Sequence, residues 1–335
     1  MANLITSVST KGSSEYELFI KPFLEDPIIS SLPMTFKMAK LGLPRDVYFN
    51  TQLDKVARGK TTCGWDFVGG AAFTKKPLTP IEIGFAVEQC YTVFANTIFA
   101  DGLPDGYQRG ELSQEIRAIM MDLLNDAINR DLLSILLLGD TAVSESTDYY
   151  SLMDGFYKKL SALDGTVYDA GTVTDTELLP ANIEATMYKV FNAQSPRLRQ
   201  VPANRKKFIV TGSVYDAWNR YIQIGTNSTG AIVDRTSILN GVAASTYQGI
   251  ELVPLRIVDE RLTGDPALIT SPLADENRIV LTMPENHFVG MDGEAFSNIN
   301  MWYENKDDKF YATASALLAY EYGYDDLNVI AGFNS

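Results

Sequence analysis

Very few residues of this sequence could act together as a catalytic site. The single histidine is His287, in the stretch TMPENHFVG, and the two cysteines are Cys63 and Cys90. A serine or cysteine nucleophile would have to use that one histidine as its base, and a metal-binding pair of histidines is impossible. The Gly-x-Ser-x-Gly turn and the glycine-rich phosphate loops are missing from the sequence. An enzyme would have to work with carboxylates alone, so we predict no catalytic residue.

The remaining candidates have ordinary structural interpretations. His287 follows a Pro-Glu-Asn stretch at a turn or strand edge, where a lone histidine is usually structural. Cys90 lies in a helical pattern and is expected to be a small core residue. The stretch DGLPDG (101–106) could offer carboxylates to calcium, but a Pro/Gly turn needs no metal. We therefore expect no cofactor and no metal.

Composition and charge limit the function further. The 335 residues are 46% hydrophobic and 21% charged, as in ordinary globular proteins. No apolar run reaches the roughly 18 residues of a membrane span. The start, MANLITSVSTKGSSEYEL, is polar where a secretion signal needs an apolar core. We therefore expect a protein of the cytoplasm that does not contact a membrane.

The net charge of −14 is distributed unevenly. Residues 1–76 carry a net +3, residues 77–250 a net −7 and residues 251–335 a net −10. Such an acidic chain has no basic groove for nucleic acid, so tight DNA binding is not expected. The acidic surface is either simply solvated, or the basic front of one copy meets the acidic back of another.

Residues 45–76 are predicted to form a long hairpin. RDVYFNTQLDKVARG (45–59) and TTCGWDFVGGAAFTKK (61–76) are two extended arms around Gly59. Their side chains include too few apolar groups for a core of their own, and an isolated hairpin is marginally stable in water. The hairpin must therefore lie either on its own domain or on a neighbouring copy.

Two helices are expected to follow. Thr79, Pro80 and Glu82 have the spacing of a helix start, which predicts a helix from 79 to Ala100. A second helix is predicted over 113–138 and ends at Gly139. Its first part has a single apolar stripe, with spacings of three and four (Ile116, Ile119, Met120, Leu123, Leu124, Ala127, Ile128). Its last turns, LLSILLL, are apolar on all sides, so other elements must surround them.

The remaining sequence indicates an α+β fold. KKFIVTG (206–212) is predicted to be a buried strand, with Ser213 as the cap of the helix that follows. YQGIELVPL (247–255) and RIVLTM (278–283) are further strands. The C-terminal stretch is expected to form a long hairpin around NKDD, followed by a final strand.

The order and spacing of four stretches resemble the tailed-phage major capsid proteins of the Hong Kong 97-type fold. An extended loop ends in FTKKPLTP, and a long helix ends in LLLGD and is followed by SLMDGFYKKL. A strand and helix, KFIVTGSVYDAWNRYI, precede YQGIELVPL, and the last stretch is ALLAYEYGYDDLNVIAGF. The resemblance covers residues 45–333, and no single motif is a signature.

The resemblance implies a layout. It comprises an N-terminal arm (1–44), an extended loop (45–76), a peripheral domain (77–200) with a spine helix (113–138), an axial domain (201–289) and a C-terminal ribbon of the peripheral domain (290–335).

The resemblance also implies a function. The chain would assemble with itself into hexamers and pentamers, which form an icosahedral shell in the host cytoplasm. The shell would become the virion capsid and enclose double-stranded DNA without binding it tightly. A separate scaffolding protein, a portal and a possible decoration protein would be its partners. The alternatives are an encapsulin-like compartment shell and, remotely, a carboxylate-dependent hydrolase.

Two groups of residues are expected to contact other subunits. Near the tip of the extended loop they are Lys55, Arg58, Lys60, Trp65 and Phe67. At the turn of the C-terminal hairpin, which would lie near three-fold contacts, they are Glu304, Lys306, Asp307, Asp308 and Lys309. Asp325 and Asp326 are further candidates to receive the basic loop of a neighbour.

Overall fold

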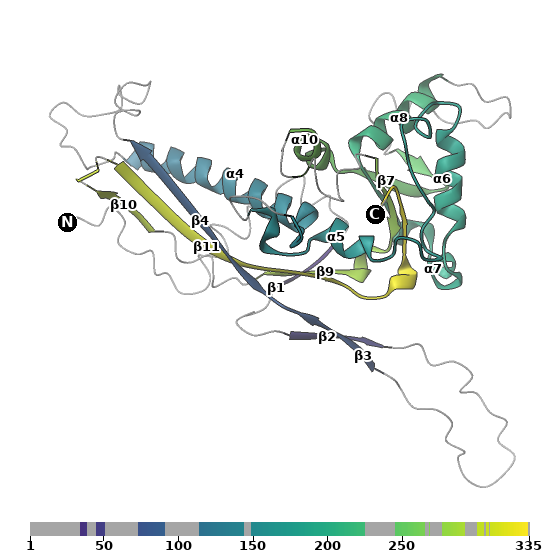
Figure 1. The fold of residues 1–335 in the computed structure, drawn as a ribbon, viewed down its shortest axis with the longest axis horizontal. Helices are drawn as coiled ribbons and strands as arrows, with labels where there is room; N and C mark the ends of the chain where they lie inside the picture. The colour runs from purple at the N-terminus through teal and green to yellow at the C-terminus, as the bar shows by residue number, and fades with distance from the viewer. Residues whose placement is uncertain are drawn as a thin grey trace, which may run out of the picture.

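The computed structural model describes two five-stranded sheets, a two-stranded ribbon and one long helix in an elongated molecule (Figure 1). The described residues are 34–38, 45–50, 73–90, 114–143, 149–224, 245–264, 268, 277–291, 300–304, 306–307 and 309–333. None of the described helices is long and apolar enough to cross a membrane.

The long sheet is built on β11 (Lys309–Tyr322). One edge of β11 pairs antiparallel with β4 (Ile81–Cys90) over its first ten residues. Its other edge pairs first with β10 (Asn300–Glu304) and then with β9 (His287–Met291), and β1 (Thr35–Met38) lies parallel to β9. The C-terminal hairpin expected from the sequence is therefore confirmed as β10 and β11, with β12 (Asn328–Ala331) as the final strand.

The side chains of β11 alternate between the two faces of the sheet, as the period of two in a strand requires. Ala312, Ala314, Ala316 and Leu318 are buried beneath the long helix, whereas the residues between them are half-exposed. This sheet therefore has one core face and one face that is only partly covered.

The expected helix 79–100 is wrong in its described part, because residues 81–90 form strand β4. Ile81, Ile83 and Phe85 alternate with exposed residues, and ten consecutive pairs with β11 outweigh the local helix-start signal at Thr79. Residues 91–100 lie outside the described part. Cys90, expected in the core, is exposed at the end of β4.

The long helix α4 (Gln114–Leu138) confirms the predicted helix 113–138 to within one residue at its start. Leu124 and Ile128 of the expected stripe are buried, but Ala127 is exposed. From Leu132 to Leu138 every residue is buried. This end of α4 is surrounded by α5 (Phe156–Ser161), α10 (Arg256–Gly264) and apolar residues of both sheets.

Two glycines close the end of α4 against the next segment. Gly155 donates its backbone N–H to the carbonyl of Gly139 at 2.8 Å. A Cβ at Gly139 would lie 2.6 Å from the carbonyl oxygen of Ile135 and would also collide with that of Met153. The stretches LLLGD and SLMDGF therefore meet with backbone touching backbone, which only glycine permits here.

The small sheet has the order β12–β8–β5–β7–β6, with β5 and β7 parallel and the other pairs antiparallel. Its remaining strands are β5 (Lys207–Val210), β6 (Thr246–Tyr247), β7 (Ile250–Pro254) and β8 (Ile279–Thr282). All four residues of β8 and of β12 are buried, so both faces of this sheet are covered.

Each face of the small sheet has its own apolar core. Ile209, Val280 and Ile330 face the end of α4. Phe208 and Leu281 face the second core, beneath α6 (Ile183–Asn192) and α8 (Gly212–Ile224). That core also includes residues that the expected layout places in the peripheral domain, namely Val173, Ile183, Met187, Val190 and Leu198, together with Val329 and Ala331 of β12. The short helix α7 (Pro196–Gln200) follows α6, and the two are seen at the right of Figure 1.

The prediction that Ser213 caps α8 is wrong. Ser213 lies inside the first turn, since the helix begins at Gly212. The carboxylate of Asp259, from α10, accepts the backbone N–H of Gly212 at 2.7 Å. Burial raises the pKa of Asp259, while hydrogen bonds from this helix start lower it. The cap therefore comes from a residue 47 positions away.

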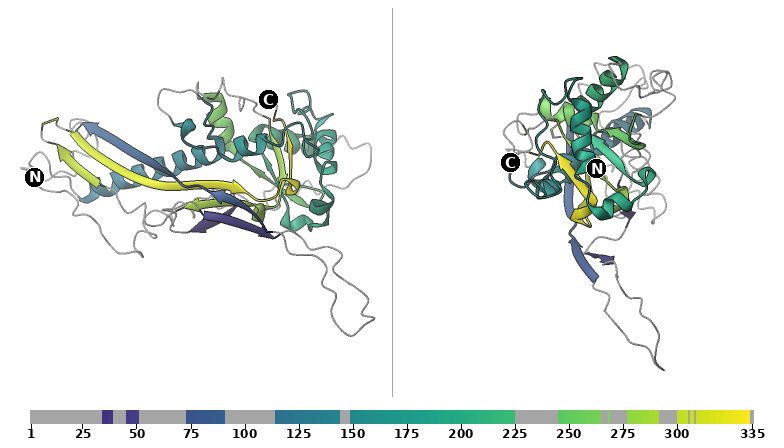
Figure 2. Two further views of the ribbon diagram at one scale, coloured as in Figure 1. Left: turned by 60° about the horizontal axis from the view of Figure 1, so that its bottom comes forward. Right: turned by 90° about the vertical axis from the view of Figure 1, so that its right-hand side faces the viewer.

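The base of the predicted hairpin is described as β2 (Arg45–Asn50) paired antiparallel with β3 (Phe73–Leu78). The chain passes between the two sheets where β11 leads to β12 and where β8 leads to β9, and we call this region the joint. Figure 2 shows the two-stranded ribbon leaving the body of the molecule beside the joint. Residues 51–72 lie outside the described part.

Candidate functional site

The residues expected at the tip of the loop lie outside the described residues, so their contacts stay predictions. These are Lys55, Arg58, Lys60, Trp65 and Phe67, together with Asp308 of the second group. The other members of the second group, Glu304, Lys306, Asp307 and Lys309, lie at the turn between β10 and β11.

The turn between β10 and β11 is polar and held by contacts within the chain. The ammonium group of Lys309 donates to Glu88 of β4 at 2.9 Å, and this hydrogen bond raises the pKa of Lys309. The hydroxyl of Tyr311 donates to Asp307 at 3.2 Å, and its ring stacks on Trp302 with centroids 5.5 Å apart. Lys309 therefore neutralises an acid of β4 in its own chain.

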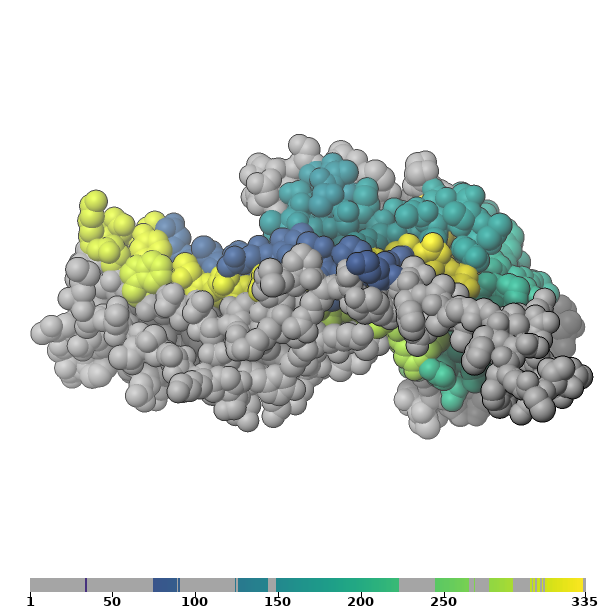
Figure 3. Space-filling view, turned by 90° about the horizontal axis from the view of Figure 1, so that it is seen from below, coloured from purple at the N-terminus to yellow at the C-terminus, as the bar shows by residue number. Residues whose placement is uncertain are grey.

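The outer edge of β4 is a second candidate surface. Among the described strands β4 pairs with β11 alone, and Figure 3 shows it at the surface beside β11. Its Val87 is 46% exposed. A groove of about 300 Å³ lies between β4 and α4, lined by Phe85, Val87, Ala127 and Asp131 among others. An exposed, partly apolar edge strand of this length is a site where further chains add.

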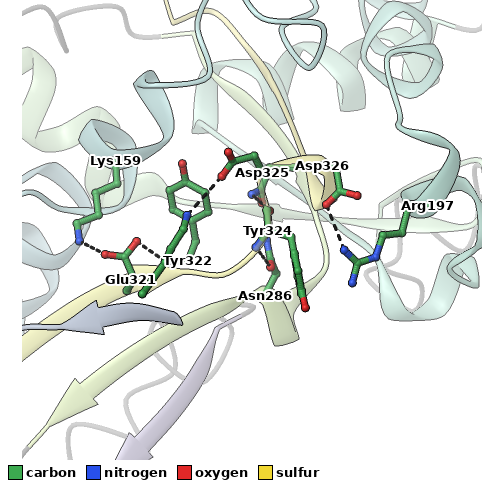
Figure 4. A network of polar contacts seen from close by, with 10 residues as sticks. Lys159, Arg197, Asn286, Glu321, Tyr322, Tyr324, Asp325 and Asp326 are labelled. Carbon is green, nitrogen blue, oxygen red and sulfur yellow. Dashed lines mark hydrogen bonds and ion pairs between the residues drawn. The ribbon is translucent and has the colours of Figure 1, made fainter. Parts of the chain in front are cut away.

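A third candidate is the connection between the two sheets, residues 321–327, which comprises the last two residues of β11 and the turn that leads to β12 (Figure 4). Lys159 of α5 forms an ion pair with Glu321 at 2.6 Å, and Arg197 of α7 one with Asp326 at 3.4 Å. Lys76 of β3 lies 3.4 Å from Asp325. Three acids of one short segment are thus paired with bases from three different elements.

A second connection between the sheets, residues 283–286, links β8 to β9 and lies beside the first. The side chain of Asn286 donates to the carbonyl of Tyr324 at 2.9 Å and accepts its N–H at 2.8 Å. The N–H of Gly323 donates to the carbonyl of Asn286 at 2.8 Å. The two connections are therefore joined by one backbone hydrogen bond and two hydrogen bonds of the Asn286 side chain, which restrain the two sheets relative to each other.

His287 is buried at this joint, as its expected structural role requires. Its ring nitrogens lie 2.7 Å from the hydroxyl of Thr282 and 2.7 Å from that of Tyr320. Burial lowers the pKa of His287 to about 3. Both nitrogens are engaged and the ring is inaccessible to solvent, so this histidine is not arranged as a general base. In the described part of the chain, no three His, Cys, Asp or Glu side chains are grouped as a metal site would need.

The basic partners of Glu321, Asp325 and Asp326 could not be predicted from the sequence. Asp325 and Asp326 were candidates to receive cations of a neighbouring copy, and both are paired inside their own chain. Lys76 lies in the basic N-terminal part of the sequence, residues 1–76. It pairs with Asp325 of the acidic C-terminal part within one chain, whereas the expected attraction was between copies. The cluster of Glu321, Asp325 and Asp326 indicated that basic partners were needed. The sequence did not indicate which ones, because the partners are distant along the chain.

No protein-family profile and no curated protein matches this sequence. Solved structures do match its fold. The structure "Satellite phage P4 procapsid including size determination (Sid) protein" has a TM-score of 0.56 at 10% identity, covering 94% of this chain and 97% of that one.

The chain has the fold of a phage capsid protein. The structure "Capsid of native GTA particle computed with C5 symmetry" has a TM-score of 0.55 at 11% identity and covers 90% of this chain and 88% of that one. "The capsid of Myoviridae Phage XM1" has a TM-score of 0.52 at 11% identity, covering 89% of each. At such identities the likeness concerns the fold, which is the mixed α/β fold of capsid subunits.

Proposed function

We propose that this chain is the major capsid protein of a tailed phage and has no catalytic activity of its own. The observation that carries the proposal is the capsid fold along nearly the whole of the chain, 94% of it in one comparison. The arrangement would be of the Hong Kong 97 type, with the arm, loop, peripheral and axial domains expected from the sequence, and with Val173, Leu198 and Val329 sharing the core of the axial domain. Copies would form hexamers and pentamers of an icosahedral shell around double-stranded DNA.

Two features of the described residues support self-association. The edge of β4 has no second ladder partner among the described strands, and the adjacent groove has apolar walls. A further copy that covers this edge would satisfy its backbone groups and bury Val87. The ribbon β2–β3 leaves the body of the molecule (Figure 2), and it would contact a neighbouring copy.

The direct test is electron microscopy of the purified chain, expressed alone and with the scaffolding protein we expect it to need. Closed shells of uniform size are the expected result. A chain that stays monomeric under every assembly condition, with its scaffold included, contradicts the proposal. The portal and any decoration protein would be identified in particles purified from the host.

A second test concerns DNA. Because the chain carries a net charge of −14, a like-charged inner wall would let packaged DNA slide rather than hold it. We expect negligible affinity for duplex DNA at physiological salt in a filter-binding assay. Tight, salt-sensitive binding by the subunit would show that it grips the genome instead.

The loop contacts can be tested by charge reversal. Replacement of Arg58 and Lys60 by Glu is expected to impair assembly, because these cations would face an acidic region of a neighbour. The variant should remain folded by circular dichroism, and Lys189→Glu on α6 is the matched control. If the reversed variant assembles normally and its shells resist high salt like the wild type, apolar contacts of Trp65 and Phe67 dominate.

A further inference from the structure

The ribbon β2–β3 is not held in direction by the hydrogen bonds of the long sheet. Strand β4 is fixed to β11 from Ile81 onward, whereas β3 pairs with β2 instead. Thr79 and Pro80 separate the two strands, and proline has no N–H to offer a ladder. The chain can therefore change direction at this point without breaking a ladder hydrogen bond.

Two side chains of β3 contact the body beyond this break. Leu78 is buried and packs with Ala319 of β11. The ammonium group of Lys76 lies 4.1 Å from the centre of the Tyr322 ring and 3.4 Å from a carboxylate oxygen of Asp325. Lys76 thus makes a cation–π contact and an ion pair with one group of neighbouring residues.

The residues that Lys76 holds belong to the connection between the two sheets. Tyr322 is the last residue of β11, and Asp325 begins the turn that leads to β12. The connection is fixed from its other sides, because Arg197 pairs with Asp326 and lies 3.9 Å above the ring of Tyr324. Lys159 anchors Glu321 at the β11 end. Lys76 therefore ties the ribbon to a segment that contacts of α5 and α7 also hold.

We propose that Lys76, Tyr322 and Asp325 form a latch that sets the direction of the β2–β3 ribbon relative to the joint between the two sheets. When the latch is closed, the ribbon keeps a fixed direction; when it opens, the ribbon turns at Leu78, Thr79 and Pro80, and Leu78 stays packed against Ala319. A displacement of the connection 321–327 and a displacement of the ribbon are thereby coupled. The proposal concerns contacts within one chain and does not depend on the proposed shell function.

The latch is strong enough to favour one direction and weak enough to open. Lys76 and Asp325 keep 31% and 56% of their side-chain surface exposed, so salt screens their attraction. An exposed ion pair and an exposed cation–π contact each change an equilibrium by roughly two- to five-fold. Together they favour the closed direction by about ten-fold.

The experiment measures distances by electron–electron double resonance in the full chain. Spin labels are placed at Tyr48→Cys on β2 and Arg199→Cys on α7, in a background with Cys63→Ser and Cys90→Ser. Unlabelled chain is added in excess, so that only distances within a chain are read even if copies associate. We expect one narrow distance distribution for the parent chain.

Lys76→Met, which removes the charge and keeps the length of the side chain, is expected to add a second distance population or broaden the distribution markedly. Asp325→Asn should have a smaller effect, because the ring contact remains, and Lys76→Arg should restore the narrow distribution. Lys207→Met is the matched control, since its cross-strand ion pair with Glu251 in the small sheet is also part-exposed. High salt should broaden the parent distribution and leave that of Lys76→Met unchanged.

The proposal is overturned if Lys76→Met and Asp325→Asn both give the narrow distribution of the parent chain. It is also overturned if Lys207→Met broadens the distribution as much as Lys76→Met, because the effect would then not be specific to the latch. Circular dichroism establishes that each variant is folded. A failure of the shell proposal leaves this measurement valid, since nothing in it requires assembly.

Discussion

Helix α4 begins in one environment and ends in another, and this contrast separates the two sheets. Up to Arg130 the helix lies on the long sheet, with Leu124 and Ile128 buried and Ala127 exposed. From Leu132 onward it lies between the two sheets and is buried on all sides. The amphipathic part of α4 packs on a sheet with one core face, and its apolar end packs in a core that surrounds it on all sides.

The two sheets differ in the same way. Strands β8 and β12 of the small sheet are fully buried, so both faces of this sheet are covered within one chain. The long sheet alternates buried and half-exposed residues along β11 and has an open edge at β4. We therefore expect the small sheet to determine the stability of the single chain, and the long sheet to determine association.

The largest effect is expected at the closed end of α4. Gly139→Ala should prevent folding or lower the free energy of unfolding by more than about 4 kcal/mol, because the new Cβ would collide with two backbone carbonyls. Chemical denaturation of the variant measures it. Gly84→Ala on β4, where a Cβ meets nothing within 4 Å, is the control and should change the unfolding free energy by less than about 0.5 kcal/mol. A tolerated Gly139→Ala would mean that the helix end is not closely packed.

A somewhat smaller loss is expected from a cavity in the same region. Leu136→Ala should lower the free energy of unfolding by about 3 kcal/mol, since this side chain is completely buried between the sheets. Ala127→Ser, at the exposed part of the same helix, should change it by less than about 0.5 kcal/mol. Equal losses in urea denaturation would contradict the contrast between the two parts of α4.

The joint between the sheets should be acid-sensitive. Burial holds the pKa of His287 at about 3, below the ordinary value near 6.5, so the unfolded chain binds a proton that the folded chain excludes. Stability contributed by the neutral ring is complete above about pH 6.5 and falls as the pH decreases toward 3, by at most about 1.4 kcal/mol per pH unit. Replacement His287→Gln removes this group, so the stability difference between wild type and variant should shrink from pH 7.5 to pH 5. If the difference in unfolding free energy stays constant over this range, protonation of His287 is not linked to folding.

The smallest effect on stability, with a large effect on association, is expected at the open edge. Val87→Lys places a charge on an exposed position of β4 and should change the free energy of unfolding by less than about 0.5 kcal/mol. If a second copy covers this edge, the same change should impair shell formation in electron micrographs, because a lysine on an edge strand opposes pairing. Normal shells from this variant would remove β4 from the assembly surface.

Much of the fold could be predicted from local pattern. Helix α4 and its end at Gly139, the C-terminal hairpin and the final strand follow from spacings within a few residues, and the structure confirms them. The scarcity of catalytic residues is a matter of composition alone. Such features are determined by the sequence, because each depends on neighbours close along the chain.

The tertiary structure decided the rest. Residues 81–90 carry a helix-start signal and still form a strand, because β11, more than 200 residues away, supplies a complete ladder. Lys76 and Asp325 are separated by 249 positions, and the cap of α8 comes from Asp259 rather than from Ser213. A charge or a cap reveals its own chemistry in the sequence but not its partner, because the partner is chosen by the folding of the chain in three dimensions.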